Sequence, residues 1–81
     1  MGDFAKLFQS EKYGQICVIK QGNDDLIPEI RFFVEPETLG VCQKALTFED
    51  TDEGWDSCDK AFETIDVGVA EIAVKDIFDL V

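Results

Sequence analysis

The residues with the clearest chemical pattern are carboxylates spaced for one side of a helix. Five of them follow one another at intervals of four, three, four and three residues: Asp52, Asp56, Asp59, Glu63 and Asp66. At 100° per residue these intervals place all five within an arc of about 80°, in a row about 21 Å long. Glu53 adds a carboxylate in the first turn of the same segment. The pattern predicts a helix surface of one charge sign.

Two interpretations of this row stay open at this point. Like charges four residues apart destabilise an isolated helix by about 0.2–0.5 kcal/mol per pair, so the row has a small cost in stability. It is either a solvated helix face of an acidic protein or a binding surface for a cationic groove. A field of one sign accelerates association with a basic partner. Lys60 is the one lysine in this segment, and we expect it on another side of the helix.

Metal binding is another use for such carboxylates. The stretch Asp50–Asp56 resembles part of an EF-hand calcium loop, which closes with a bidentate Glu at its twelfth position. Counted from Asp50 that position is Ala61, and counted from Glu49 it is Lys60. We therefore predict no dedicated metal site and keep a weak divalent-cation binder as an alternative function.

Enzymatic chemistry has little support in the sequence. The chain contains no histidine, which excludes Ser-His and Cys-His nucleophile pairs and histidine metal ligands. Acid–base catalysis by paired carboxylates needs one pKa raised by burial, whereas the carboxylates here are predicted on an exposed face. Ser10 and Ser57 have no base nearby in the sequence. We predict a protein that is not an enzyme, with no catalytic residues and no cofactor.

The charge balance limits the partners. The 81 residues include 18 acidic and 7 basic side chains, which gives a formal net charge of −11. Residues 49–81 alone hold eleven acidic and two basic side chains. Such a chain is not expected to bind nucleic acid directly or an anionic membrane surface, because both need lysines and arginines. The partner that the charge suits is a basic protein.

The composition predicts a folded protein that stays reduced. Hydrophobic residues make up 46% of the chain, including seven phenylalanines, which is typical of one small domain over residues 1–81 rather than an acidic disordered tail. Cys17, Cys42 and Cys58 are odd in number and lack C-x-x-C spacing. We expect them to be reduced thiols packed in the core. The N-terminus lacks the features of a signal peptide, which favours a cytoplasmic protein.

The hydrophobic periodicity predicts an α+β fold. A short N-terminal helix capped by Asp3 is expected over residues 3–10. Three strands are expected to form an antiparallel meander, over residues 15–21, 27–35 and 40–49. In the second strand Ile30, Phe32 and Val34 face one side. The other side carries Arg31 between acidic neighbours, which predicts a surface ion pair with Glu29 and Glu35.

Two helical segments are expected to cover one face of this sheet. The first is expected to be capped by Asp50 or Thr51 and has an apolar stripe: Trp55, Cys58, Phe62 and Ile65. Residues 66–68 are expected to break or kink it, because glycine is unfavourable inside a helix. For residues 69–80 a helix is favoured, with a charged ribbon of Glu71, Lys75 and Asp79 opposite Val69, Ala73, Ile77 and Leu80. A strand over these residues stays an alternative.

In size and charge the chain resembles the inhibitors that phages and mobile elements make against host DNA-binding machinery, including anti-CRISPR and anti-restriction proteins. The resemblance implies a protein that mimics nucleic-acid charge and occupies a basic groove of a DNA- or RNA-binding protein. The partner-binding residues would be Asp52, Glu53, Asp56, Asp59, Glu63 and Asp66. The alternative is a self-associating structural or adaptor module, such as a homodimer, with Phe33 on the polar side of the second strand at the interface.

Overall fold

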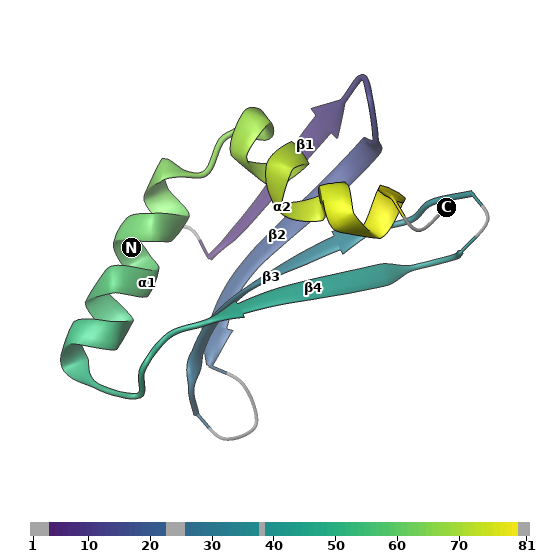
Figure 1. Ribbon diagram of the computed structural model, residues 1–81. Helices are drawn as coiled ribbons and strands as arrows, with labels where there is room; N and C mark the ends of the chain where they lie inside the picture. The colour runs from purple at the N-terminus through teal and green to yellow at the C-terminus, as the bar shows by residue number, and fades with distance from the viewer. Residues whose placement is uncertain (1–3, 23–25, 38, 80–81) are drawn as a thin grey trace.

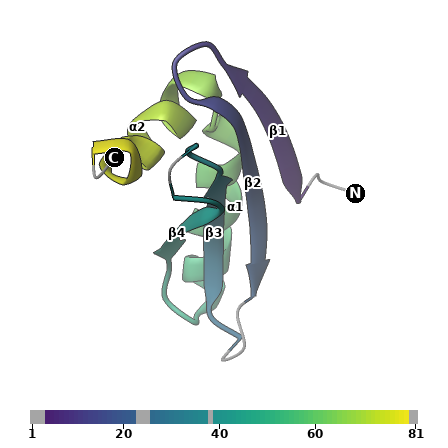
Figure 2. The ribbon, with the colours of Figure 1, turned by 90° about the vertical axis from the view of Figure 1, so that its right-hand side faces the viewer.

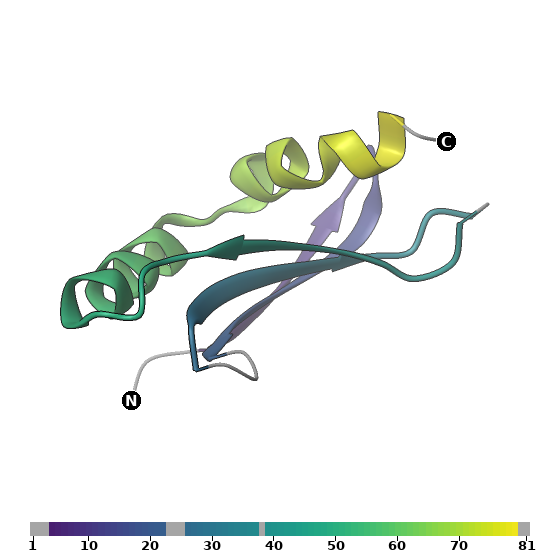
Figure 3. The same cartoon turned by 60° about the horizontal axis from the view of Figure 1, so that its bottom comes forward.

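The computed structural model describes residues 4–22, 26–37 and 39–79. Four strands pair antiparallel in the order β1-β2-β3-β4, and two helices follow them in the chain. Both helices lie on the same face of the sheet (Figure 1, Figure 3). The elements are β1 (Ala5–Ser10), β2 (Gly14–Gly22), β3 (Pro28–Val34), β4 (Cys42–Thr47), α1 (Asp52–Thr64) and α2 (Val67–Asp79). The predicted α+β class is confirmed, with one strand more than expected.

The core lies between the sheet and the helices. Apolar side chains recur at every second residue of β2 and β3, so they point to the same side of the sheet. Five of them are at most 3% exposed: Ile16, Val18, Ile30, Phe32 and Val34. They pack with buried side chains of the two helices: Cys58, Phe62, Ala70 and Val74. Burial of these groups, at about 25 cal/mol per Å² of apolar area, holds the helices on the sheet.

The meander of β2, β3 and β4 confirms the three predicted strands, with each end within two residues of its predicted position. The register pairs Cys17 with Phe33 across β2 and β3, and Phe33 with Gln43 across β3 and β4. The turn predicted between the first two strands includes residues 23–25, which lie outside the described residues.

The predicted helix over residues 3–10 is wrong, because this segment is strand β1. It pairs antiparallel with β2, with Leu7 opposite Cys17 and Phe8 opposite Ile16. Its burial has a period of two: Leu7 is 60% exposed, whereas Ser10 is 7% exposed. Gly14, with φ +80°, allows the tight return into β2. Pairing with β2 outweighs the local helical spacing, and the predicted cap Asp3 lies outside the described residues.

Helix α1 begins where its sequence predicts. The Thr51 hydroxyl caps it by accepting a hydrogen bond from the Gly54 amide at 2.9 Å. Cys58 and Phe62 face the core, and Trp55 is half-buried beside Gly22 at the end of β2. A break between the two helices forms as predicted, but it lies at Ile65 and Asp66 rather than at residues 66–68, because α1 ends at Thr64 and Val67 and Gly68 belong to the first turn of α2.

Helix α2 is the favoured of the two predicted structures for its segment. Ala70 and Val74 are its fully buried residues. The expected apolar face is therefore rotated: Ala73 and Ile77 pack at the edge of the core, but Val69 is 43% exposed. Leu80, expected on the same face, lies outside the described residues.

The charged ribbon predicted on α2 is only partly formed. The Lys75 ammonium pairs with Asp79 at 2.9 Å. The Glu71 carboxylate instead accepts a hydrogen bond from the Ser10 hydroxyl at 2.5 Å. The Ser10 oxygen also accepts hydrogen bonds from the Lys12 and Tyr13 amides. Glu71 therefore ties α2 to the turn between β1 and β2.

The second face of the sheet carries the odd-numbered residues of the four strands, and we call it the open sheet face. The helices lie on the opposite side (Figure 2, Figure 3). The predicted pair of Arg31 and Glu29 forms here at 2.7 Å, but Glu29 is buried, with 1% of its side chain exposed. Cys17 lies on this face and not in the core as predicted, whereas Cys58 is buried in the core.

Neither α1 nor α2 has the length and apolar character that crossing a membrane requires, among the residues described.

Candidate acidic interaction surface

The predicted partner-binding carboxylates lie on the outward side of α1 and in the junction that follows it. We call this set the α1 acidic surface: Asp52, Glu53, Asp56, Asp59, Glu63 and Asp66. All six residues are exposed. The opposite side of α1 is fixed in the core by Cys58 and Phe62, which are at most 1% exposed. The helix therefore holds its carboxylates toward solvent in a defined arrangement.

Two lysines from the sheet anchor the C-terminal half of α1. The Lys6 ammonium donates a hydrogen bond to the Phe62 carbonyl at 2.6 Å. The Lys20 ammonium pairs with the Asp59 carboxylate at 2.9 Å. The two ammonium groups also lie 4.8 Å and 5.4 Å from the centroid of the Phe62 ring, a geometry in which cation–π attraction adds to the packing.

Two carboxylates of the row have lysine partners, which the sequence did not predict. Asp59 pairs with Lys20, and Asp56 pairs with Lys60 at 3.0 Å. The expectation that Lys60 lies away from the row is therefore wrong, because at i, i+4 the two side chains share one side of the helix. Both carboxylates stay accessible, with 65% of Asp56 and 51% of Asp59 exposed. An exposed ion pair of this kind stabilises a protein by about 0–1 kcal/mol. An arginine or lysine of a partner can therefore displace Lys20 or Lys60 from these carboxylates.

Asp66 is not on α1, which corrects the prediction of five carboxylates on one continuous helix. The backbone of Ile65 is extended, with φ −70° and ψ 124°, and this ends α1. The Asp66 carboxylate accepts a hydrogen bond from the Val69 amide at 2.9 Å. Asp66 therefore caps the start of α2, where a negative charge is favourable.

Carboxylates without a lysine partner lie at both ends of α1, Asp52 and Glu53 at its start and Glu63 in its last turn. Among the residues that the structure describes, Asp52, Glu53 and Glu63 form no ion pair. Glu49 and Asp50, just before the helix, are also exposed. The partial positive charge of a helix N-terminus stabilises acidic residues in this position.

Sequence reasoning left Glu49 and Asp50 out of the candidate site, although they directly precede the Thr51 cap. A cleft of about 300 Å³ lies between the end of β4 and this first turn. Its acidic lining comes from Glu49 and Glu53. Their position just before a predicted helix N-terminus could have identified Glu49 and Asp50 from the sequence, whereas the helical period could not.

The segment that resembles an EF-hand loop has a different structure. Thr51 caps the helix and Asp52 begins its first turn, so these residues do not form a calcium-binding loop. Within the described parts of the chain, no group of three His, Cys, Asp or Glu side chains is arranged to hold a metal ion.

The thiols are free, and one of them is chemically distinct. Cys17 and Cys42 are partly exposed, whereas Cys58, on the core side of α1, is buried. Burial raises the pKa of the Cys58 thiol above its ordinary value of 9.0, and the nearby Asp59 carboxylate raises it further. Lys20 acts in the opposite direction on this pKa. Cys58 is therefore an inert core thiol at neutral pH.

The arrangement as a whole offers negative charge on a rigid support. The arrangement can attract cationic groups of a partner, because its carboxylates are exposed and α1 holds them in place. No protein-family model matches the chain, and no curated protein or solved structure is significantly similar to it.

Proposed function

We propose that this chain is a non-enzymatic inhibitor that occupies a basic groove of a DNA- or RNA-binding protein or complex, as anti-CRISPR and anti-restriction proteins of phages and mobile elements do. One observation carries the proposal. All six residues of the α1 acidic surface are exposed, and four of them, Asp52, Asp56, Asp59 and Glu63, follow one side of α1, while Cys58 and Phe62 fix another side of this helix in the core. A rigid anionic ridge needs little reorganisation before it enters a cationic groove.

The charge density supports this interpretation. Residues 49–66 contain eight acidic side chains and a single lysine. Asp52, Asp56, Asp59 and Glu63 are separated by 11 residue steps in all, which is about 16.5 Å along the helix axis, or about 5.5 Å between successive carboxylates. This spacing is of the same order as the rise of about 3.4 Å per phosphate along one DNA strand.

The lysine partners inside the chain reduce this charge only locally. Lys20 and Lys60 each contact one carboxylate of the surface. The free carboxylates at the start of α1 leave that end strongly negative. We therefore place the first contact with the partner at Asp52 and Glu53, with Asp56, Asp59 and Glu63 following along the groove.

The proposed setting is the cytoplasm, where the partner's nucleic acid is handled. Three free thiols, one of them buried in the core, are compatible with the reducing conditions there.

Competition with nucleic acid tests the function directly. A fluorescently labelled DNA duplex is bound in turn to a restriction enzyme, an RNA-guided nuclease and a basic chromosomal protein, and the chain is titrated in. We expect displacement of DNA from at least one of them, measured by fluorescence anisotropy, and weaker displacement at higher salt. Failure to displace DNA from all of them at low salt contradicts the proposal for these classes of partner.

A further inference from the structure

The open sheet face is almost free of net charge, unlike the rest of the chain. Among the odd-numbered residues of the four strands, Glu29 and Arg31 are the charged ones, and they pair with each other at 2.7 Å. Glu35, directly after β3, adds one exposed carboxylate at the border of this face. Most of the formal charge of −11 therefore lies elsewhere on the molecule. A basic partner attracted to the α1 acidic surface has no electrostatic reason to bind this face.

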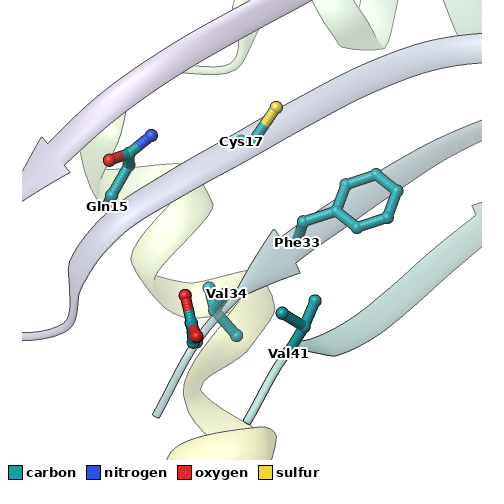
Figure 4. Close-up of a pocket in the computed structure, with 6 residues that line it drawn as sticks. Gln15, Cys17, Phe33, Val34 and Val41 are labelled. Carbon is teal, nitrogen blue, oxygen red and sulfur yellow. The ribbon is translucent and has the colours of Figure 1, made fainter. Parts of the chain in front are cut away.

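An apolar strip runs across β1, β2 and β3 on this face. Leu7, Cys17 and Phe33 are directly opposite one another in the registers of β1, β2 and β3. Leu7 is 60% exposed, and Val41 beside β4 is 65% exposed. Cys17, Phe33 and Val41 border a cleft of about 240 Å³ (Figure 4). Exposed apolar side chains that adjoin one another in this way mark a contact surface.

Most polar side chains of the open sheet face are glutamines, which can form hydrogen bonds with the same side chains of a second copy. All four glutamines of the chain lie here: Gln9, Gln15, Gln21 and Gln43. A carboxamide both donates and accepts hydrogen bonds, so an identical amide is a matching partner. Gln21 and Gln43 also bond to the ion pair of Glu29 and Arg31, at 3.0 Å and 2.7 Å, which satisfies those charges within the chain.

The face is also large enough for a specific contact. Strands of six to nine residues, about 4.8 Å apart and rising about 3.3 Å per residue, give a footprint of about 440 Å². The accessible area exceeds this footprint because it follows the pleats and side chains. The area that two such faces bury together therefore comes close to the total of about 1,000 Å² that a specific interface needs.

We propose that two copies of this chain form a homodimer by packing their open sheet faces against each other around a two-fold axis. The strip of Leu7, Cys17 and Phe33 lies at the centre of the interface. The low net charge of this face favours a second copy, because two molecules that each carry −11 repel least where these faces meet. The dimer directs both α1 acidic surfaces outward, so its formation does not depend on the proposed inhibitor function.

The test is the oligomeric state of the whole chain, measured by sedimentation velocity from low micromolar to submillimolar concentration. Two variants place a carboxylate in the strip, Leu7→Glu and Phe33→Glu. The control Ile72→Glu makes the same kind of change at a residue of α2 that is 76% exposed. We expect a dimer for the wild type and the control, and a dissociation constant raised at least about 100-fold in both strip variants, because an unpaired carboxylate is costly to bury.

Salt separates this dimer from binding of a basic partner. Added salt screens the repulsion between the two acidic chains, so the dimer persists or strengthens, whereas binding through the α1 acidic surface weakens. Circular dichroism confirms that each variant is folded, and if Phe33→Glu unfolds, the exposed position of Leu7→Glu decides the result. A monomeric wild type over the whole concentration range, or a dimer that survives the strip substitutions, overturns the proposal.

Discussion

The Lys6 ammonium on β1 donates a hydrogen bond to the Phe62 carbonyl at the end of α1, at 2.6 Å and 56 residues away in the sequence. It also reaches the Ile65 carbonyl at 3.2 Å. The last carbonyls of a helix lack donors within the helix and carry a partial negative charge. Lys6 supplies both the donor and the opposite charge, and so fixes the end of the helix that carries the acidic surface.

Replacing Lys6 tests this anchor. We expect Lys6→Met to lower the free energy of unfolding by about 1–2 kcal/mol, because the carbonyls lose a charged donor in a partly buried place. Lys60→Met is the matched control: Lys60 is 75% exposed and forms only a surface pair, so its loss changes stability by less than about 0.5 kcal/mol. Urea denaturation measures both, and equal effects of the two substitutions contradict the assigned role.

A glycine in the first turn of α1 is required by close packing. A Cβ atom at Gly54 would collide with the Glu49 backbone carbonyl. We expect Gly54→Ala to destabilise the fold by about 2 kcal/mol or more, although alanine is the better helix former by about 1 kcal/mol. Thermal unfolding is the measurement.

Gly68 in the first turn of α2 provides the control for this substitution. The nearest atom to an added Cβ there is an Asp66 carboxylate oxygen at 3.4 Å, which is an ordinary contact. Gly68→Ala should therefore leave the stability unchanged or raise it by up to about 1 kcal/mol. A Gly54→Ala protein as stable as Gly68→Ala would show that the Glu49 backbone gives way.

The alternation of β-branched and aromatic residues was enough to predict β2 and β3, because both strands bury one side in the core. The same reasoning failed for β1. The spacing of Phe4, Leu7 and Phe8 is that of a helix face, but in the structure Leu7 is exposed on the open side of a strand. Pairing with β2 decides the structure of this segment, and this pairing has no local signature in the sequence.

The candidate site shows the same limit. The helical period correctly placed Asp52, Asp56, Asp59 and Glu63 on the outside of α1. It could not reveal Lys20, which reaches Asp59 from β2. Such a contact depends on how helix and sheet pack. The pair of Asp56 and Lys60, in contrast, could have been predicted from the sequence, because the two residues have i, i+4 spacing.

The buried thiol predicts a pH dependence of stability. The thiol of Cys58 has an ordinary pKa of 9.0, and burial raises this pKa in the folded chain. Between the ordinary pKa and the raised pKa, the native state therefore binds more protons than the unfolded state. Its contribution to the free energy of unfolding is therefore complete below pH 9.0 and is lost as the pH rises through the folded pKa. Urea denaturation at neutral and alkaline pH should show this decline.

Variants isolate the contribution of Cys58 from that of other groups that titrate at alkaline pH. Cys58→Ala lowers stability at neutral pH because it leaves a cavity in the core, but the decline at alkaline pH should become shallower. Cys17→Ala, at the partly exposed cysteine of the open sheet face, should keep the wild-type decline. An unchanged decline in Cys58→Ala would assign the effect to other groups.

The salt dependence of binding to a nucleic-acid-binding protein that the chain displaces from DNA is the most direct test of the acidic surface. Asp56→Asn/Glu63→Gln removes two of its charges, and Glu11→Gln/Glu37→Gln removes two exposed charges elsewhere. We predict that the first variant binds at least about 10-fold more weakly at low salt, with a shallower dependence of affinity on salt, and that the second stays close to wild type. Equal affinities and equal salt slopes for the two variants would contradict the claim that the outer side of α1 binds the partner.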